Sequence, residues 1–308
     1  MKKGFFLFLL ALANYSQAQT HELGGGMGFA YYFGDLNIVN HNRHPFTFIT
    51  ESFNSKNYKM AYSLSYRYNM PNRFSFGANF NHLYLSGYDS DNNSKEKYDQ
   101  EWGRLVRNLS FHTAVNSLTV DVRYEPFRTE KSWGTAYSWD YENTWLISPY
   151  AGAGLGLFSF NPKTWYKGEV IELQPLGTEG QGIKPYADKY NLVGLIMPFS
   201  LGLRFVEPNR VFSLGIDFTY TYTFTDYLDD VSSKTYVSPS VFYTNYEPEK
   251  AALVVALANR NPESAYPGVI GSTEDIRGNP SQSDTYLSGQ FRFTIFLDAF
   301  QERYWRFK

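Results

Sequence analysis

The chain has 308 residues, and its 28 basic and 30 acidic side chains give a formal net charge of −2, so it lacks the basic excess of a nucleic-acid-binding protein. Its mean hydropathy of −0.41 is too polar for a bundle of membrane helices, whereas an aromatic content of 19% favours β-structure with aromatic belts. Cysteine is absent, which excludes disulfides, thiolate metal sites and cysteine nucleophiles.

The N-terminal segment has the pattern of a cleaved secretory signal. The basic stretch Met1-Lys2-Lys3 precedes the apolar run 5–13, and small residues follow at Ser16 and Ala18. This run is too short to cross a hydrocarbon core of ~30 Å, which needs about 20 residues. We therefore expect a signal peptide at residues 1–18 and a single outer-membrane β-barrel domain at residues 19–308.

Eight segments then alternate apolar and polar residues with a period of two, as strands with one apolar face do. The clearest is 212–225, in which large apolar side chains occupy the even positions and small or polar ones the odd positions. In chain order, the segments are 22–33, 62–68, 74–80, 118–125, 151–157, 199–205, 212–225 and 287–295. An even number of strands places both chain ends on one side of a membrane.

The connections between these segments alternate in length. Two are tight turns built on Pro-Asn-Arg, at residues 70–73 and 207–210, and a longer one begins at Glu125-Pro126. The other four are long and polar: 35–58, 88–112, 161–191 and 226–284. Outer-membrane barrels alternate in this way, with short periplasmic turns and long external loops.

The sequence thus predicts an all-β fold, an eight-stranded antiparallel transmembrane up-and-down β-barrel with long extracellular loops. It also predicts a location in the cell outer membrane, with the N- and C-termini in the periplasm. The alternative is a soluble lipocalin-like barrel or a β-sandwich, in which the apolar face points inward.

The polar faces of the strands carry charged residues that would point into the lumen. These residues are Arg67, Asp121, Arg123, Glu125, Arg204, Asp217 and Arg292. An eight-stranded barrel is only wide enough for its own side chains, and unpaired buried charges are costly. We therefore expect a salt-bridged plug in place of an open pore, with a proton or ion path as the alternative.

No catalytic or metal-binding motif stands out in the sequence. The five histidines form no H-E-x-x-H motif, and no G-x-S-x-G elbow is present. His82 and His112 fall near Ser86 and Ser110, at the outer ends of neighbouring strands, without a third orienting residue. The acidic cluster that starts at Asp226 has oxygens suited to calcium but lacks the EF-hand spacing. We expect a non-enzymatic protein with no catalytic residue, cofactor or metal.

The connection 126–146 would face the periplasm, like the tight turns. It contains Trp133, Trp139 and Trp145 among charged residues, and the C-terminal tail adds Trp305. Aromatic side chains with a charged surround are typical of interface hot spots, so we predict a docking surface for a periplasmic partner. A belt of aromatic residues in the lipid headgroups is the alternative.

Residues 247–259, in the fourth long connection, are predicted to form a short helix. Pro248 suits the first helical turn, alanine and leucine dominate the segment, and Asn261-Pro262 would stop it. The helix would pack over the barrel mouth as a lid, with a partner-binding role as the alternative.

The long connections also carry specific strings: LQPLGTEGQG at 173–182, TDYLDDVS at 225–232 and RGNP at 277–280. Together with YYFGDLN at 31–37, they make the chain similar to the PorG-type outer-membrane β-barrels of bacteria that use type IX secretion. The motif residues that carry this resemblance are Gln174, Pro175, Gly177, Glu179, Gly180, Asp226, Asp229, Asp230, Arg277, Gly278, Asn279 and Pro280.

The resemblance implies attachment to the periplasmic secretion ring made by the lipoprotein PorK and by PorN, and it brings no catalytic residues. From it we expect a non-enzymatic component of the type IX protein secretion machinery that contacts outer-membrane lipid and anchors or docks periplasmic ring components. The alternative is a stand-alone structural or small-molecule-binding outer-membrane barrel.

Overall fold

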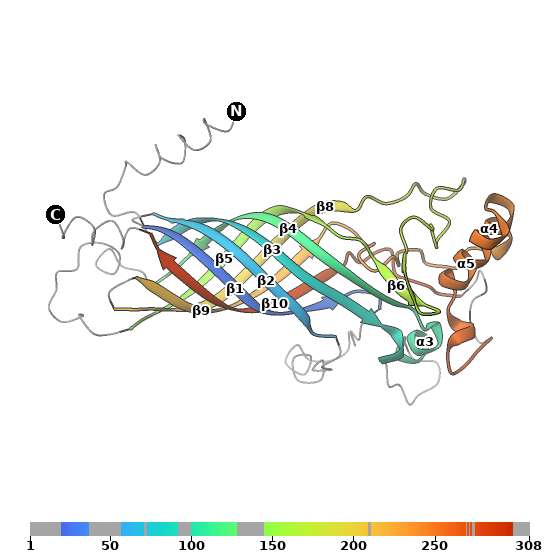
Figure 1. Ribbon diagram of the computed structural model, residues 1–308, viewed down its shortest axis with the longest axis horizontal. Coiled ribbons are helices and arrows are strands. Elements are labelled where there is room, and N and C mark those ends of the chain that lie inside the picture. Colours follow the sequence, from blue (N-terminus) through green and yellow to red (C-terminus); the bar gives the residue numbers. More distant parts are fainter. Residues whose placement is uncertain are drawn as a thin grey trace.

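The computed structural model describes residues 20–36, 57–70, 73–91, 100–127, 145–208, 211–268, 270, 272 and 275–297. Eight long antiparallel strands form its body (Figure 1). They are β1 (Thr20–Phe33), β2 (Lys59–Asn69), β3 (Phe74–Tyr88), β4 (Ser110–Tyr124), β5 (Leu146–Ser159), β8 (Val193–Val206), β9 (Phe212–Thr223) and β10 (Thr285–Phe296).

The eight strands close into an up-and-down barrel. Each pairs with its neighbour in sequence, β1 pairs with β10, and the pairing of β3 with β4 completes the ring. Because Glu22 is paired with Phe296, the first and last strands begin and end at the same end of the barrel. Among the described residues, no helix is long and apolar enough to cross a membrane.

The outer wall of the barrel is apolar, because side chains alternate between the two faces of each strand. Large apolar side chains are exposed on every strand, among them Leu64, Phe80, Leu118, Leu155 and Leu201. Exposing such a continuous apolar band to water would be unfavourable, whereas the outer wall of a membrane barrel is apolar because it contacts lipid. The predicted eight-stranded transmembrane barrel is therefore confirmed, and the soluble barrel with an apolar interior is wrong.

Several strands are longer than their alternating segments. β3 continues from Phe80 to Tyr88, and β4 begins at Ser110, eight residues before the predicted start at Leu118. Over the added part of β3, Leu85 and Ser86 are both buried although they point to opposite faces. The period-two pattern of burial is therefore lost in this part of the strand.

The described parts of the long connections gather at the end of the barrel opposite Thr20 and Phe296 (Figure 1). We call this structure the cap. Its elements are η1 (Asp89–Asp91), α3 (Gln100–Arg107), β6 (Lys163–Tyr166), β7 (Glu169–Glu172), α4 (Pro239–Asn245), α5 (Pro248–Ala258) and η3 (Asn261–Glu263). The predicted helix is confirmed as α5, whereas α3, α4 and the β6–β7 hairpin were not predicted.

One apolar core runs from the cap end of the lumen into the cap. It contains Leu83 and Phe111 from the strands together with Val254 and Leu257 of α5. On α5 the buried positions 251, 254, 257 and 258 share one face, as expected of a helix packed on a core. The cap is thus a packed structure that closes one end of the barrel.

Candidate functional site

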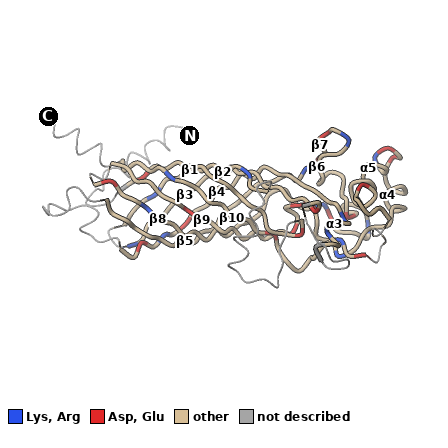
Figure 2. Tube along the Cα trace, turned by 90° about the horizontal axis from the view of Figure 1, so that it is seen from below, with Lys and Arg blue, Asp and Glu red and all other residues tan. Residues whose placement is uncertain are grey.

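The lumen holds a layer of charged residues in the half of the barrel nearest Thr20 and Phe296 (Figure 2). Arg204 lies between two carboxylates there. Its Nη1 donates to both carboxylate oxygens of Glu22 at 2.9 Å, and its Nη2 donates to Glu125 Oε2 at 2.9 Å. Asn69 donates to Glu22 at 2.5 Å and Ser148 donates to Glu125 at 3.0 Å. Each carboxylate thus accepts from Arg204 and from one neutral side chain.

Arg67 and Asp121 form a second buried pair. Arg67 Nη2 lies 2.8 Å and 3.0 Å from the two Asp121 oxygens, and Asn79 Nδ2 donates to Asp121 Oδ1 at 2.6 Å. The pair passes over Gly77, where a Cβ atom would lie 2.4 Å from Asp121 Oδ1. A residue with a side chain at position 77 would displace this ion pair.

Asp217 forms ion pairs with the remaining two arginines. Its Oδ2 is 3.6 Å from Arg123 Nη2, 3.3 Å from Arg292 Nε and 2.5 Å from the hydroxyl of Tyr150, which donates to it. Thr219 donates to Oδ1 at 2.7 Å. The Arg123 guanidinium also lies 3.7 Å above the Tyr150 ring, a cation–π contact. Asp217 therefore holds two arginines in place.

All seven charged residues expected in the lumen take part in these ion pairs, together with one that sequence reasoning missed. The four arginines face four carboxylates: Glu22, Asp121, Glu125 and Asp217. The sequence could have predicted the inward position of Glu22, because Glu22 is an even-numbered residue of β1, like the inward-facing Gly24 and Gly26. The layer is therefore formally neutral, which offsets the cost of burying its charges.

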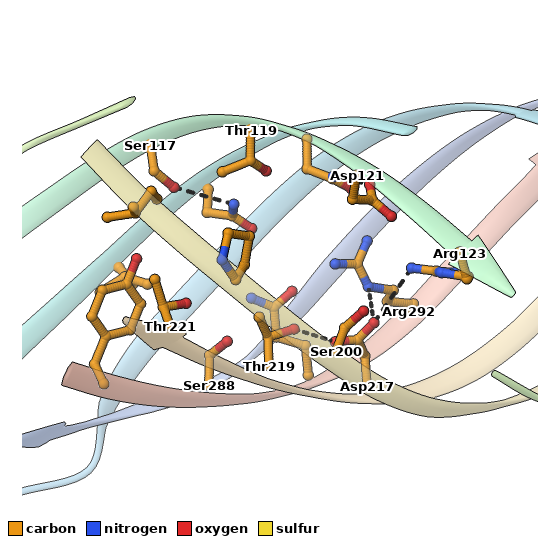
Figure 3. A pocket seen from close by; sticks show the side chains of 17 residues that line it. Ser117, Thr119, Asp121, Arg123, Ser200, Asp217, Thr219, Thr221, Ser288 and Arg292 are labelled. Atoms are coloured by element: carbon orange, nitrogen blue, oxygen red, sulfur yellow. Dashed lines mark hydrogen bonds and ion pairs between the residues drawn. The ribbon is translucent and has the colours of Figure 1, made fainter. Parts of the chain in front are cut away.

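A small cavity lies beside the charged layer on its cap side (Figure 3). Asp217 and Arg292 border it at one end, and Leu83, Ile196 and Tyr286 line it towards the cap. Its volume is about 40 Å³, enough for a few water molecules, since one needs roughly 10–15 Å³. Pockets for small-molecule ligands are about ten times larger.

The family-type motifs of the loops meet in the cap, around Glu179. Its Oε1 accepts a salt bridge from Arg277 Nη1 and hydrogen bonds from the backbone N–H groups of Ser232 and Ser233, both at 2.9 Å. Its Oε2 accepts from Ser233 Oγ at 3.0 Å and from Gln181 Nε2 at 3.2 Å. Glu179 and Arg277 are both buried, so this carboxylate joins three distant segments of the chain.

Asp230 extends this cluster. Thr178 Oγ1 and the Tyr190 hydroxyl each donate to one of its carboxylate oxygens at 2.6 Å, and Arg277 Nη1 donates to its backbone carbonyl at 3.4 Å. Burial raises the pKa of the Asp230 carboxyl to about 7, although Arg277 and both hydroxyls favour the charged form. We therefore expect this carboxyl to titrate far above the ordinary range of an aspartate.

Two further acids share one hydroxyl. Tyr32 OH lies 2.6 Å from Asp229 Oδ2 and 2.5 Å from Asp284 Oδ1. A phenol has a single proton to donate, so the second contact requires a proton on one of the carboxyls. Burial, reinforced by neighbouring carboxylates that include Asp35, raises the pKa of both acids well above the usual range. The pair thus keeps a proton at neutral pH.

Arg107 of α3 ties the cap to the first connection. It pairs with Asp89, with Nε–Oδ2 at 2.7 Å, and donates to the backbone carbonyl oxygens of Arg277 and, at 2.8 Å, Asp35. Asp35 in turn accepts from the backbone N–H of Asn279 at 2.8 Å. Arg107 lies outside the strings that drew attention in the sequence, so sequence reasoning missed it.

The other motif residues of the third connection shape its backbone. Gln174 Nε2 donates to the carbonyl oxygen of Tyr190 at 2.9 Å, and the carbonyl of Pro175 accepts from a lysine side chain at 2.7 Å. Gly177 and Gly180 have φ of 66° and 81°, in the left-handed region that favours glycine. These glycines turn the chain so that Glu179, between them, points inward.

The motif residues of the fourth connection differ in burial. Gly278 is buried, and a Cβ atom there would lie 2.8 Å from Asp35 Oδ2. Asn279 and Pro280 are exposed at the surface. Asp226 is half-buried, and burial raises the pKa of its carboxyl to about 8. Within the described residues, no cluster of acids and histidines has the geometry of a metal site.

The serine–histidine pairing considered from the sequence is not formed by the described residues. His82 Nδ1 is hydrogen-bonded to Asn116 Oδ1 at 2.7 Å, and the His112 ring stacks on Trp165. His112 lies opposite Ser86 in the β3–β4 strand pairing, but its ring contacts Trp165 of the β6–β7 hairpin. Neither histidine has a hydrogen bond to a serine in the part of the chain that the structure describes.

Of the four tryptophans expected to dock a partner, only Trp145 lies within the described residues. It precedes β5, is half exposed, and packs edge-on against Phe212 at the end of the barrel away from the cap. Trp133, Trp139 and Trp305 lie outside the described residues, as does the signal segment 1–18. The docking surface stays a prediction.

A comparison with protein families identifies the group to which this barrel belongs. The model of a domain of unknown function, DUF6089, matches residues 2–251, most of the chain. The chain belongs to the DUF6089 family. The matched region includes Glu179 and Asp230 and ends within α5, before Arg277 and β10. No curated protein matches the chain.

Among solved structures, this DUF6089 protein is similar to Neisserial surface protein A, with 9% identity, a TM-score of 0.39 and coverage of 91% of this chain and 99% of that one. It is also similar to Ail, the attachment invasion locus protein of Yersinia pestis, with 10% identity, a TM-score of 0.34 and coverage of 91% and 99%. A third is the outer membrane enzyme PagL, with 11% identity, a TM-score of 0.29 and coverage of 89% and 98%. Similarities this low assign no function.

Proposed function

We propose that this protein is a non-enzymatic outer-membrane component of the type IX secretion machinery, which anchors or docks the periplasmic ring. The observation that carries the proposal is the filled lumen, in which four arginines are paired with four carboxylates beneath a packed cap. A barrel whose lumen is closed in this way has no passage for solutes, so its role would depend on partners that bind its surfaces.

The choice of machinery rests on the resemblance of the loop strings to PorG-type barrels. Those strings build the motif cluster, in which Glu179, Asp230 and Arg277 are buried together. The proposal places the cap outside the cell and the chain ends in the periplasm, where PorK- and PorN-like ring proteins would bind. An aromatic side chain at the rim, Trp145, is then available on the periplasmic side.

The test is copurification of the native protein from membranes in mild detergent after light cross-linking. We expect ring proteins to be recovered with the wild type and lost when residues 130–143 are replaced by a Gly/Ser linker. As a matched control, replacing the tip of the β6–β7 hairpin, residues 166–169, alters only the cap and should leave recovery unchanged. Heat-modifiable migration on a gel shows in each case that the barrel is folded.

The outcomes separate the parts of the proposal. Recovery of ring proteins with the linker variant at the wild-type yield would contradict docking through residues 130–143 and redirect attention to the loops. No ring protein with the wild type would contradict the secretion role, leaving a stand-alone structural barrel. The water-sized lumen cavity argues against a small-molecule-binding role inside the barrel.

A further inference from the structure

The outer wall of the barrel has a groove over β1. One row of paired positions crosses five strands, in the order Phe80, Leu64, Gly25, Phe293 and Leu214. Four of these residues have large exposed side chains, and the glycine at the centre has none. The hollow that lies over this glycine and between the neighbouring side chains has a volume of about 620 Å³.

The walls of this groove are apolar and partly aromatic. The next row towards the cap adds Tyr62, Met27 and Phe291, all exposed. A Cβ atom at Gly25 would touch only the carbonyl oxygen of Ser63, at 3.9 Å, so its floor is open. A groove of this volume falls within the range of ligand-binding pockets, although it faces outward from a membrane barrel.

We infer that the groove binds one acyl chain of a membrane lipid. The inference rests on the membrane location given above, because the groove is continuous with the apolar band that faces lipid. β2 and β10 flank β1, so their backbones are about 9.6 Å apart across the groove, two strand spacings. A single hydrocarbon chain fits between the side chains of those strands, whereas a transmembrane helix of about 10–12 Å does not.

The groove would retain an acyl chain because it offers the chain more contacts than a flat wall does. An acyl chain that lies in the groove touches side chains on both walls as well as the backbone floor, whereas a chain on a flat wall touches one side only. Many weak dispersion contacts then add up to slower exchange with the bulk lipid. Because recognition is by the chain, the headgroup should matter little.

The test uses the full barrel in vesicles that contain phosphatidylethanolamine with a spin label on one acyl chain. We expect a motionally restricted lipid component that Gly25→Leu diminishes, because the new side chain projects from the floor into the groove, where its Cβ atom meets only the Ser63 carbonyl oxygen, at 3.9 Å. The control is Ala153→Leu, at an exposed, outward position on β5 away from the groove. It should leave the component unchanged, and labelled phosphatidylglycerol should give the same result.

Equal restricted components in the wild type and Gly25→Leu would overturn the inference. Rapid disulfide formation between Gly25→Cys barrels, in vesicles with a low ratio of protein to lipid, would also overturn it, because a second barrel would then occupy the groove. The native chain has no cysteine to interfere. Loss of heat-modifiable migration in the wild type would instead contradict the membrane barrel itself. A failed inference is thus distinguishable from a failed membrane barrel, and copurification with ring proteins tests the proposed function separately.

Discussion

Asp217 is a meeting point of the lumen, where Arg123, Arg292, Tyr150 and Thr219 all contact one carboxylate. Buried ion pairs of this kind are not by themselves a source of stability, because desolvation consumes much of the Coulomb attraction. Removal of one partner is nevertheless destabilising, because it leaves charges buried without compensation. The lumen is therefore most sensitive to changes at residues shared by two arginines.

We predict that Asp217→Ala lowers the free energy of unfolding by roughly 3–5 kcal/mol, since both arginines lose their carboxylate. Urea titration of the barrel in lipid vesicles, followed by gel mobility, measures the change. Thr219→Ala removes only a neutral donor to the same carboxylate and should cost about 0.5–1.5 kcal/mol. Equal losses in the two variants would contradict a special role for Asp217.

The buried acids of the cap predict a pH dependence. A raised pKa means that the folded cap holds protons which the unfolded cap releases, so the free energy of opening falls as pH rises between the two pKa values. The window runs from the ordinary carboxyl pKa of 3.8 to about 7 for Asp230 and about 8 for Asp226. The groups around them are Asp35, Glu179, Asp229, Arg277 and Asp284.

We therefore expect the protection of cap peptides against hydrogen exchange to decrease from pH 4 to pH 8, after correction for the pH dependence of the intrinsic exchange rate. Asp229→Asn imitates the protonated acid, because its amide can donate to Tyr32 while its oxygen keeps the bond from the Val231 N–H. This variant should show a weaker pH dependence than the wild type. A wild-type cap whose protection rises with pH would contradict the proton held by Asp229 and Asp284.

At the scale of elements, the cap depends on one buried ion pair between loops. Glu179 and Arg277 come from separate connections. Glu179 also accepts a hydrogen bond from the segment around Asp230, and Arg277 donates one to it. α5 packs beside this cluster through Ala251, Val254 and Leu257. The elements of the cap should therefore open together when the pair is broken, while the barrel beneath stays folded.

We predict that Glu179→Gln makes the cap sensitive to limited proteolysis, with a local destabilisation of roughly 3 kcal/mol or more from the unpaired Arg277. The matched control is Lys163→Ala, which breaks the salt bridge to Glu172 at 2.7 Å on the hairpin. Those side chains are 36% and 47% exposed, so the loss should be below about 1 kcal/mol. Cleavage of both variants at the wild-type rate would contradict the role of the buried pair.

At the scale of the whole molecule, the barrel is closed twice. The charged layer fills the half near the chain ends, and the apolar core that includes Leu83 and Phe111 fills the cap end. Between them, as lined by the described residues, lies the small cavity of about 40 Å³. This arrangement suits a rigid membrane anchor, since little of the lumen is left for solutes.

We predict that the purified barrel does not conduct steadily in planar bilayers, because ions would have to cross both the paired charges and the apolar core. Single-channel recording measures this directly. Removal of the cap contacts by Glu179→Gln should not open a pore, since the charged layer remains. Large, long-lived conductance steps in the wild type would contradict the filled lumen.

Much of the barrel could be predicted from the sequence. Lipid outside and a polar lumen inside impose a period of two on every strand, which is why all eight strands and the inward parity of the charges were predictable. The helix α5 was predictable from local composition alone. Strand ends were not, because Leu85 and Ser86, on opposite faces of β3, are both buried, and the alternation is lost there.

The tertiary structure alone decided the candidate site in the cap. Tyr32 meets Asp229 across 197 residues of chain, and Glu179 meets Arg277 across 98, and no periodic pattern records such pairings. The strings around Glu179, Asp230 and Arg277 singled out the residues but not their convergence. The sequence by itself thus determined the barrel, because the alternation of apolar and polar residues within each strand shows which face meets lipid and which faces the lumen. Contacts between loops depend on where the closed barrel brings their ends, and only the folded chain specifies that.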